Sequence, residues 1–177
     1  MSIAAGVSID SLQGLLPAES KVCRVMPNTP ALIGEGVSAF ALNSLCDRED
    51  VALVDKILSA CGSVVEVPEK LMDAVTGVSG SGPAYVYLFI EALIDAGITA
   101  GLPPAVARQC AVDTVVGAAR MVKKSNESPA VLKSRVMSPG GTTARGVLAL
   151  EKNKFKYAVH KAVLDATARS RELGQSD

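Results

Sequence analysis

A glycine-rich stretch that runs directly into an apolar segment constrains this sequence most. Residues 76–82 read Thr-Gly-Val-Ser-Gly-Ser-Gly, and Pro83 then starts a run of helix-compatible residues. Glycine tolerates positive φ and close backbone approach, and proline suits the first turn of a helix. We therefore predict a tight loop that feeds a buried helix from Pro83 to Ala96, ended by Gly97. Its N-terminal amides could bind a carboxylate or a phosphate. A plain glycine-rich connector between two domains explains this stretch equally well.

Two predicted helices, at residues 83–96 and 105–124, carry apolar residues almost all round. The sequence is 49% hydrophobic but only 3% aromatic, which favours closely packed helices built from small side chains. One small domain cannot cover two such helices on all sides. A second copy of the chain is the simplest cover, so we expect a homodimer or a higher homo-oligomer.

The N-terminal part of the chain alternates predicted strands with helices. Period-2 and period-3.6 patterns predict strands at 2–7, 22–26, 37–42 and 64–67, and helices at 10–16 and 48–60. Asp10 and Asp47 are the expected N-caps. This βαβ rhythm is typical of a parallel sheet, in which ligands bind at the carboxyl ends of the strands. The loops at 4–6 and 26–30 are therefore candidate site loops.

The pattern changes at Pro68, beyond which the sequence predicts helices only. Further helices are expected at 70–76, 129–136, 143–150 and 154–173. The change divides the chain into an α/β domain at 1–67 and an all-helical domain at 68–177.

Charge and cysteine content exclude several classes of function. Lysine plus arginine and aspartate plus glutamate number 18 each, so no net field attracts nucleic acid. No apolar run is long enough to predict a membrane span. The four cysteines form no CxxC pair and are expected to be reduced, mostly buried thiols of a cytoplasmic protein. A single histidine argues against a zinc site built on imidazoles, and we expect no metal.

A second loop of glycine and hydroxyl residues, Ser138-Pro139-Gly140-Gly141-Thr142-Thr143, opens another predicted helix. Backbone amides suit a carboxylate, and the hydroxyl groups add directional hydrogen bonds. No carboxylate pair, reactive cysteine or catalytic histidine stands out, so positioning should dominate the chemistry, as in hydride transfer from a nicotinamide. The alternative is that both loops serve only to cap helices.

Four blocks of this sequence resemble the pyrroline-5-carboxylate reductase family. They are Val25-Met26-Pro27-Asn28-Thr29-Pro30, Gly34-Glu35-Gly36, residues 73–85 and residues 138–143. The resemblance covers essentially the whole chain. It implies part of a Rossmann-like α/β domain followed by an all-α dimerisation domain. It also implies reduction of 1-pyrroline-5-carboxylate to L-proline, with NADP or NAD as the cofactor.

The resemblance also implies roles for individual residues. The residues that would bind the substrate are Ser138, Gly140, Gly141, Thr142 and Thr143. Thr143, which would contact the ring nitrogen, is the catalytic candidate. Cofactor binding falls on Ala4, Ala5, Gly6, Met26, Pro27 and Asn28. The pocket wall falls on Ser79, Gly80, Ser81, Gly82 and Pro83.

The sequence departs from the family at its start, because no glycine-rich dinucleotide fingerprint precedes Met1. We therefore expect a truncated form. Its alternative function is that of a catalytically impaired oligomerisation module, and a third reading is a cofactor-free binder of proline-like acids.

Overall fold

The computed structural model describes residues 1–174 and groups the chain into two compact units. The first unit contains Met1–Ala84 together with the chain from His160 onward, and the second contains Tyr85–Val159. The predicted division into 1–67 and 68–177 differs from this grouping, since the last helix returns to the first unit. The domain division stays a prediction.

The first unit is built on a three-stranded sheet in the order β1 (Cys23–Met26), β2 (Gly36–Leu42) and β3 (Gly62–Glu66). Strand β2 pairs in parallel with β3, with Gly36 opposite Gly62. The helix α2 (Arg48–Leu58) lies in the crossover between them. The sequence predicted these three strands and this helix, and the structure confirms them.

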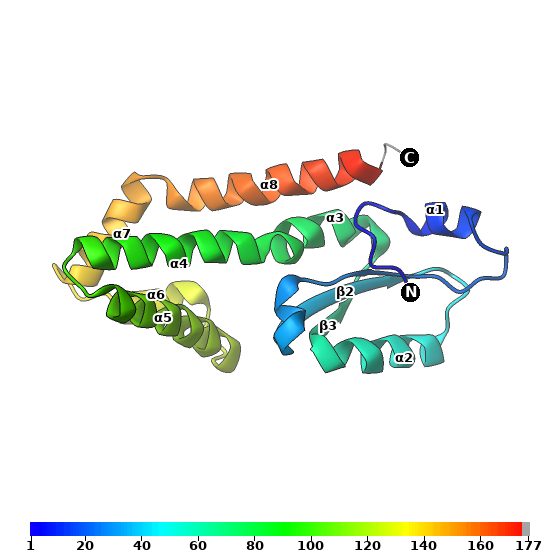
Figure 1. Cartoon of the computed structure of the whole chain (residues 1–177), viewed down its shortest axis with the longest axis horizontal. Coiled ribbons are helices and arrows are strands. Elements are labelled where there is room, and N and C mark those ends of the chain that lie inside the picture. The colour runs from blue at the N-terminus through cyan, green and yellow to red at the C-terminus, as the bar shows by residue number, and fades with distance from the viewer. Residues whose placement is uncertain (175–177) are drawn as a thin grey trace. The chain divides into compact units, whose positions relative to one another are not determined.

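Alternation along the strands creates a core on each face of the sheet. Cys23, Val25 and Phe40 pack with Val54 and Leu58 of α2. On the opposite face, Val22, Ala39 and Ala41 pack with Ile9 and Met72. These last two residues belong to α1 (Ile9–Gly14) and α3 (Met72–Val75), so helices cover both faces of the sheet (Figure 1).

Two expectations for the N-terminal part are wrong. Residues 2–7 are not a strand, because only Ser2 bridges to Arg24 and the chain then turns at Gly6, whose φ is +78°. Strand β1 pairs antiparallel with β2, so the sheet is mixed. The connection at 27–35 contains only the short turn η1 (Thr29–Ile33), and a parallel crossover needs about a dozen residues or more.

The caps of the two N-terminal helices differ in how well the sequence predicted them. Asp47 caps α2 in a reciprocal capping box with Asp50, as expected. In α1 the cap is Ser8, whose side chain accepts a hydrogen bond from the Ser11 amide, and not Asp10. Asp10 lies in the first helical turn, where its negative charge interacts favourably with the helix dipole.

The glycine-rich stretch is almost continuously helical, which corrects the predicted loop. The turn η3 (Glu69–Leu71) leads into α3, a π-helical turn η4 (Thr76–Gly80) follows, and α4 (Gly82–Thr99) begins after Ser81. No glycine between 76 and 82 has positive φ. Helix α4 also continues past Gly97, where the absence of a Cβ lets Ala107 of the next helix approach closely.

The second unit is entirely helical. Besides most of α4 it contains α5 (Pro104–Lys124), α6 (Pro129–Arg135), α7 (Thr142–Lys152) and the start of α8 (Phe155–Gly174). Ser128 caps α6 as predicted. The predicted fold class, an α/β segment followed by a helical segment, is confirmed, since no strand follows Glu66 within residues 1–174.

The cysteines are less buried than predicted. All four are free thiols, but only Cys23 is buried, Cys46 is half-buried, and Cys61 and Cys110 are exposed. Within the described residues, no helix is long and apolar enough to cross a membrane.

Candidate functional site

The predicted substrate loop forms a defined turn in front of α7. The Gly141 amide donates to the Ser138 carbonyl at 3.0 Å, and Gly140 has φ +71°. Proline at the second position and a left-handed glycine at the third are typical of a type II turn. Gly141 is the N-cap of α7, and among the described residues no side chain caps this helix. Its first amides are therefore available for an anion.

The side chains in this loop lie close to the turn. A Cβ added at Gly141 would lie 2.3 Å from the Ser138 hydroxyl oxygen, so a larger residue there would displace that hydroxyl group. Thr143 is half-buried and Thr142 is exposed. The loop thus combines an open helix N-terminus with three hydroxyl groups, a donor set that suits a small carboxylate.

The predicted cofactor residues Ala4, Ala5 and Gly6 form a turn rather than the end of a strand. Ala4 and Ala5 are exposed, and Gly6 is buried against the C-terminal end of α8. A Cβ on Gly6 would come within 3.2 Å of the Leu173 Cβ. Small residues and exposed backbone fit close approach by a flat ring, so this turn is compatible with a nicotinamide nucleotide.

Of the remaining predicted cofactor residues, Met26 ends strand β1 and Pro27 and Asn28 follow it, and all three are half-buried. The Asn28 amide group is engaged at both ends. Its Oδ1 accepts from the Val37 amide at 2.9 Å, and its Nδ2 donates to the Ser79 carbonyl at 3.1 Å. Asn28 thus joins two groups of residues that the sequence singled out separately.

The predicted pocket wall, Ser79–Pro83, comprises the end of η4 and the start of α4. A Cβ on Gly80 would lie 2.6 Å from the Met26 Cε, so the turn packs directly on the end of β1. All three of these groups belong to the first unit, whereas the substrate loop belongs to the second.

Sequence reasoning missed a charged cluster beside Gly6. Buried Arg24 pairs with Glu69 at 3.1 Å and lies 4.0 Å from Asp73, whose carboxylate also accepts from Ser170 at 2.8 Å. Arg24, Asp73 and Ser170, together with Arg171, border a cavity of about 200 Å³ next to Gly6. Arg24 could have indicated this cluster, since it lies inside an otherwise apolar strand. A charged side chain is buried only when it is paired, so an acidic partner was to be expected.

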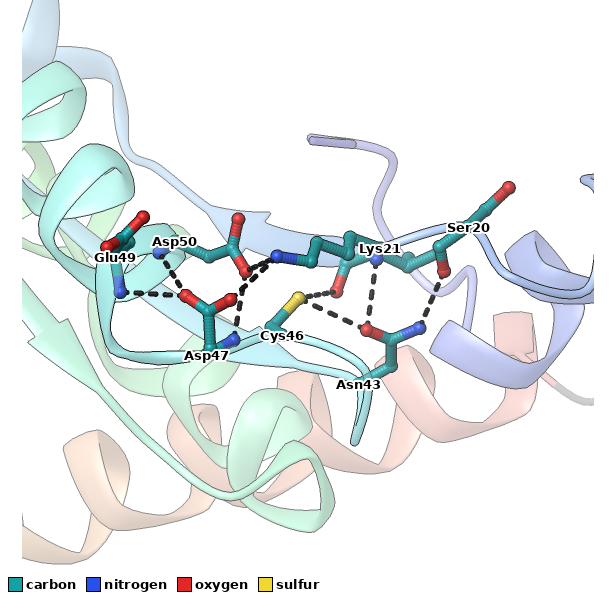
Figure 2. Close-up of polar contacts among 8 residues, drawn as sticks. Ser20, Lys21, Asn43, Cys46, Asp47, Glu49 and Asp50 are labelled. Atoms are coloured by element: carbon teal, nitrogen blue, oxygen red, sulfur yellow. Dashed lines mark hydrogen bonds and ion pairs between the residues drawn. The ribbon is translucent and has the colours of Figure 1, made fainter.

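A polar network at the other end of β1 is structural. Asn43 accepts from the Val22 amide and donates to the Ser20 carbonyl. Lys21 pairs with Asp47 and Asp50 at the start of α2 (Figure 2). Hydrogen bonds from Lys21 and from the helix amides lower the pKa of Asp47 to about 2. No group of three metal-ligating side chains occurs in the part of the chain that the structure describes.

Comparison with known proteins decides which family this chain belongs to. Residues 69–173 match the model described as pyrroline-5-carboxylate reductase dimerisation. The chain belongs to the pyrroline-5-carboxylate reductase family. It is 53% identical over 175 residues to a pyrroline-5-carboxylate reductase of a Synechocystis strain and 49% identical over 176 residues to one of Arabidopsis thaliana.

These comparisons cover almost all of this chain but only part of its relatives. The two alignments include 99% of the chain, which spans 65% and 63% of the lengths of the relatives. Among solved structures, the Plasmodium falciparum pyrroline carboxylate reductase with NADP bound matches with a TM-score of 0.92 and 44% identity, over 98% of this chain and 70% of that one. The Coxiella burnetii pyrroline-5-carboxylate reductase matches with a TM-score of 0.93 and 35% identity, over 97% of this chain and 64% of that one.

Proposed function

We propose that this protein takes part in proline biosynthesis as an NAD(P)H-dependent oxidoreductase that reduces 1-pyrroline-5-carboxylate to L-proline. Its membership of the reductase family supports the reaction. The observation on the molecule itself that carries the proposal is the uncapped N-terminus of α7 behind the turn Ser138–Gly141. A helix N-terminus of this kind stabilises a carboxylate through its amides and dipole.

The residues of the substrate loop act by binding and orientation. The amides of Thr142 and Thr143 at the start of α7 hold the substrate carboxylate, with the Gly140 amide and the Ser138 hydroxyl as further donors, while the Gly141 amide closes the turn onto the Ser138 carbonyl. This contact orients the ring so that the Thr143 hydroxyl hydrogen-bonds to its nitrogen. A positioned hydroxyl stabilises the protonated imine, which accepts hydride better than the neutral form, and it can relay the proton that the nitrogen carries in the product amine.

The cofactor residues supply a surface of small side chains and backbone. Ala4, Ala5, Gly6, Met26 and Pro27 would hold the nicotinamide half of NADP or NAD, which when bound supplies the hydride. Ser79–Pro83, in the same unit, would border the bound nucleotide. The P. falciparum relative was solved with NADP bound, which supports NADP as the cofactor.

Turnover tests the proposal directly. NADPH and 1-pyrroline-5-carboxylate are added to the purified chain, and loss of the reduced-nicotinamide absorbance is followed. We expect turnover, and we expect Thr143→Ala to lower kcat/KM by about 10²-fold, the lower range for a positioned proton-transfer group. Thr99→Ala, which removes a hydroxyl bonded only within its own helix, should leave the rate unchanged.

Two outcomes would contradict the proposal in different ways. Binding of L-proline by calorimetry without any turnover favours a cofactor-free binder. Equal rates for Thr143→Ala and the unmodified chain would remove Thr143 from the reaction while leaving the activity in place.

We also propose that the chain forms a homodimer or a higher homo-oligomer. None of the 18 residues of α4 is buried within the chain, although the helix is mostly apolar. Such a helix needs a partner surface. Should turnover be absent, this association is the alternative function, that of an oligomerisation module. The cytoplasmic location predicted from the sequence stays a prediction.

A further inference from the structure

The side chain of Asn28 connects two segments that are far apart in the sequence. Its Oδ1 accepts from the Val37 amide at the start of β2, and its Nδ2 donates to the carbonyl of Ser79 in η4. Both ends of the amide group are used within the protein. One Nδ2 hydrogen and one Oδ1 lone pair remain, but the two bonds inside the protein fix the orientation of the amide group.

The segment that Asn28 holds is a π-helical turn. The Ser81 amide donates to the Thr76 carbonyl at 2.8 Å, five residues back, which gives a wider turn than in an α-helix. Turns of this type are rare and occur frequently at functional sites. Here the wide turn presents Gly80 to Met26, where a Cβ would lie 2.6 Å from the Met26 Cε.

The opposite side of the same turn packs on α8. A Cβ on Gly77 would lie 2.3 Å from the Thr167 hydroxyl oxygen and 2.7 Å from the Val163 carbonyl oxygen. Thr167 is only 7% exposed, and its hydroxyl donates to that same carbonyl at 2.8 Å. The π-helical turn is therefore clamped between the end of β1 and α8, and Asn28 provides its hydrogen bond to the β1 side.

We propose that Asn28 is a positioning residue, which locks the π-helical turn Thr76–Gly80 to the end of β1 so that a nicotinamide nucleotide held there also orders the turn. The identity of the ligand rests on the proposed function. The mechanical link through Asn28 does not, and it is tested separately.

The first experiment uses Asn28→Asp and a matched control, Asn43→Asp. Asn43 makes the same kind of bridge in the same unit, from the Val22 amide to the Ser20 carbonyl (Figure 2). It is 8% exposed. Each aspartate keeps the acceptor and loses the donor. Asn28→Ala, which buries no new charge, serves as a second variant should Asn28→Asp fail to fold.

Hydrogen exchange of the full chain without nucleotide measures the link. We expect Asn28→Asp to speed exchange of the amides at 76–81 by about tenfold, the effect of one lost hydrogen bond, while Asn43→Asp leaves them unchanged. Unchanged exchange at 76–81 in both Asn28 variants would overturn the proposal. It would also be the result if Asn28 were only a direct ligand.

The second experiment adds NADPH and measures its Kd by fluorescence and the Kd of L-proline by calorimetry. We expect NADPH to slow exchange at 76–80 in the unmodified chain, and Asn28→Asp to weaken NADPH binding about tenfold with L-proline binding unchanged. Unchanged exchange at 76–80 on NADPH binding would overturn the proposal. If the unmodified chain binds no NADPH, the proposed function fails, and the nucleotide-free exchange still decides the link through Asn28.

Discussion

At the scale of single residues, the glycines of the segment 76–82 differ in what their missing side chains allow. Gly77 is needed because the Val163 carbonyl oxygen lies 2.7 Å from the position of a Cβ, whereas at Gly80 that position is met by the end of the flexible Met26 side chain. Gly82 has no heavy atom within 4 Å of that position and has no positive φ. Tertiary packing thus requires glycine most strictly at Gly77.

Substitution of these glycines by alanine should cause different losses of stability. We expect Gly77→Ala to destabilise the fold by about 1–3 kcal/mol through overpacking against Thr167 and Val163. Gly82→Ala, the control at the start of α4, should change stability by less than about 1 kcal/mol. Urea unfolding monitored by circular dichroism measures both. Equal losses for the two variants would contradict the assigned contacts.

The free thiols should differ in reactivity for an electrostatic reason. Burial raises the pKa of Cys23 to about 11 from an ordinary 9.0, whereas Cys61 is exposed. Because the thiolate is the reactive form, iodoacetamide at about pH 8 should label Cys61 more than about 100-fold faster than Cys23. Peptide mass spectrometry gives the two rates, and the difference should disappear in denaturant. Equally fast labelling of the folded chain would mean that Cys23 is not enclosed.

At the scale of elements, the start of α2 depends on charge as well as on hydrogen bonding. Asp47 accepts from the Glu49 and Asp50 amides, and Lys21 pairs with both Asp47 and Asp50. These contacts lower the pKa of Asp47 and raise the pKa of Lys21. The contribution of Asp47 to the free energy of unfolding is therefore fully present above its ordinary pKa of 3.8, and it is lost as the pH falls toward about 2. The contribution of Lys21 to the free energy of unfolding is fully present below about pH 10.5, and it is lost as the pH rises from there toward the raised pKa of Lys21.

Asp47→Asn tests this pH dependence, since asparagine is an equally good N-cap without the charge. We expect the Tm of the unmodified chain to fall more steeply between about pH 5 and pH 2 than the Tm of Asp47→Asn. Near neutral pH the variant should retain α2 but melt at a somewhat lower temperature because the pair with Lys21 is lost. Parallel acid profiles for the two proteins would show that the ion pair contributes nothing.

At the scale of the whole molecule, we expect the apolar surface of α4 to mediate the proposed association. Leu88 is 66% exposed and Leu15, in the first unit, is 84% exposed. We expect a dimer or larger assembly by light scattering at micromolar concentration, and we expect Leu88→Glu to weaken it by more than tenfold because a charge would be buried. Leu15→Glu should leave the assembly intact. A monomeric unmodified chain would contradict the proposed association.

Local patterns in the sequence were enough to predict many of the helices and strands. The capping box at Asp47, the apolar period of α2 and the proline starts of α5 and α6 are properties of neighbouring residues, and the structure confirms each of these helices. The same holds for the strands β1, β2 and β3, whose apolar runs predicted them, although only β1 and β2 are largely buried. The loop before α7 was likewise predicted from its glycine and hydroxyl residues, and the structure adds the left-handed conformation of Gly140.

The features that only the tertiary structure decided involve residues that are distant in the sequence. The antiparallel pairing of β1 with β2, the π-helical turn in place of the expected loop, and the bridge from Asn28 to Ser79 all depend on a partner segment. The glycine-rich stretch itself allows a loop or a helix. Close packing against Met26 on one side and Thr167 on the other selects the wide turn, because only there do two glycines let both neighbours approach.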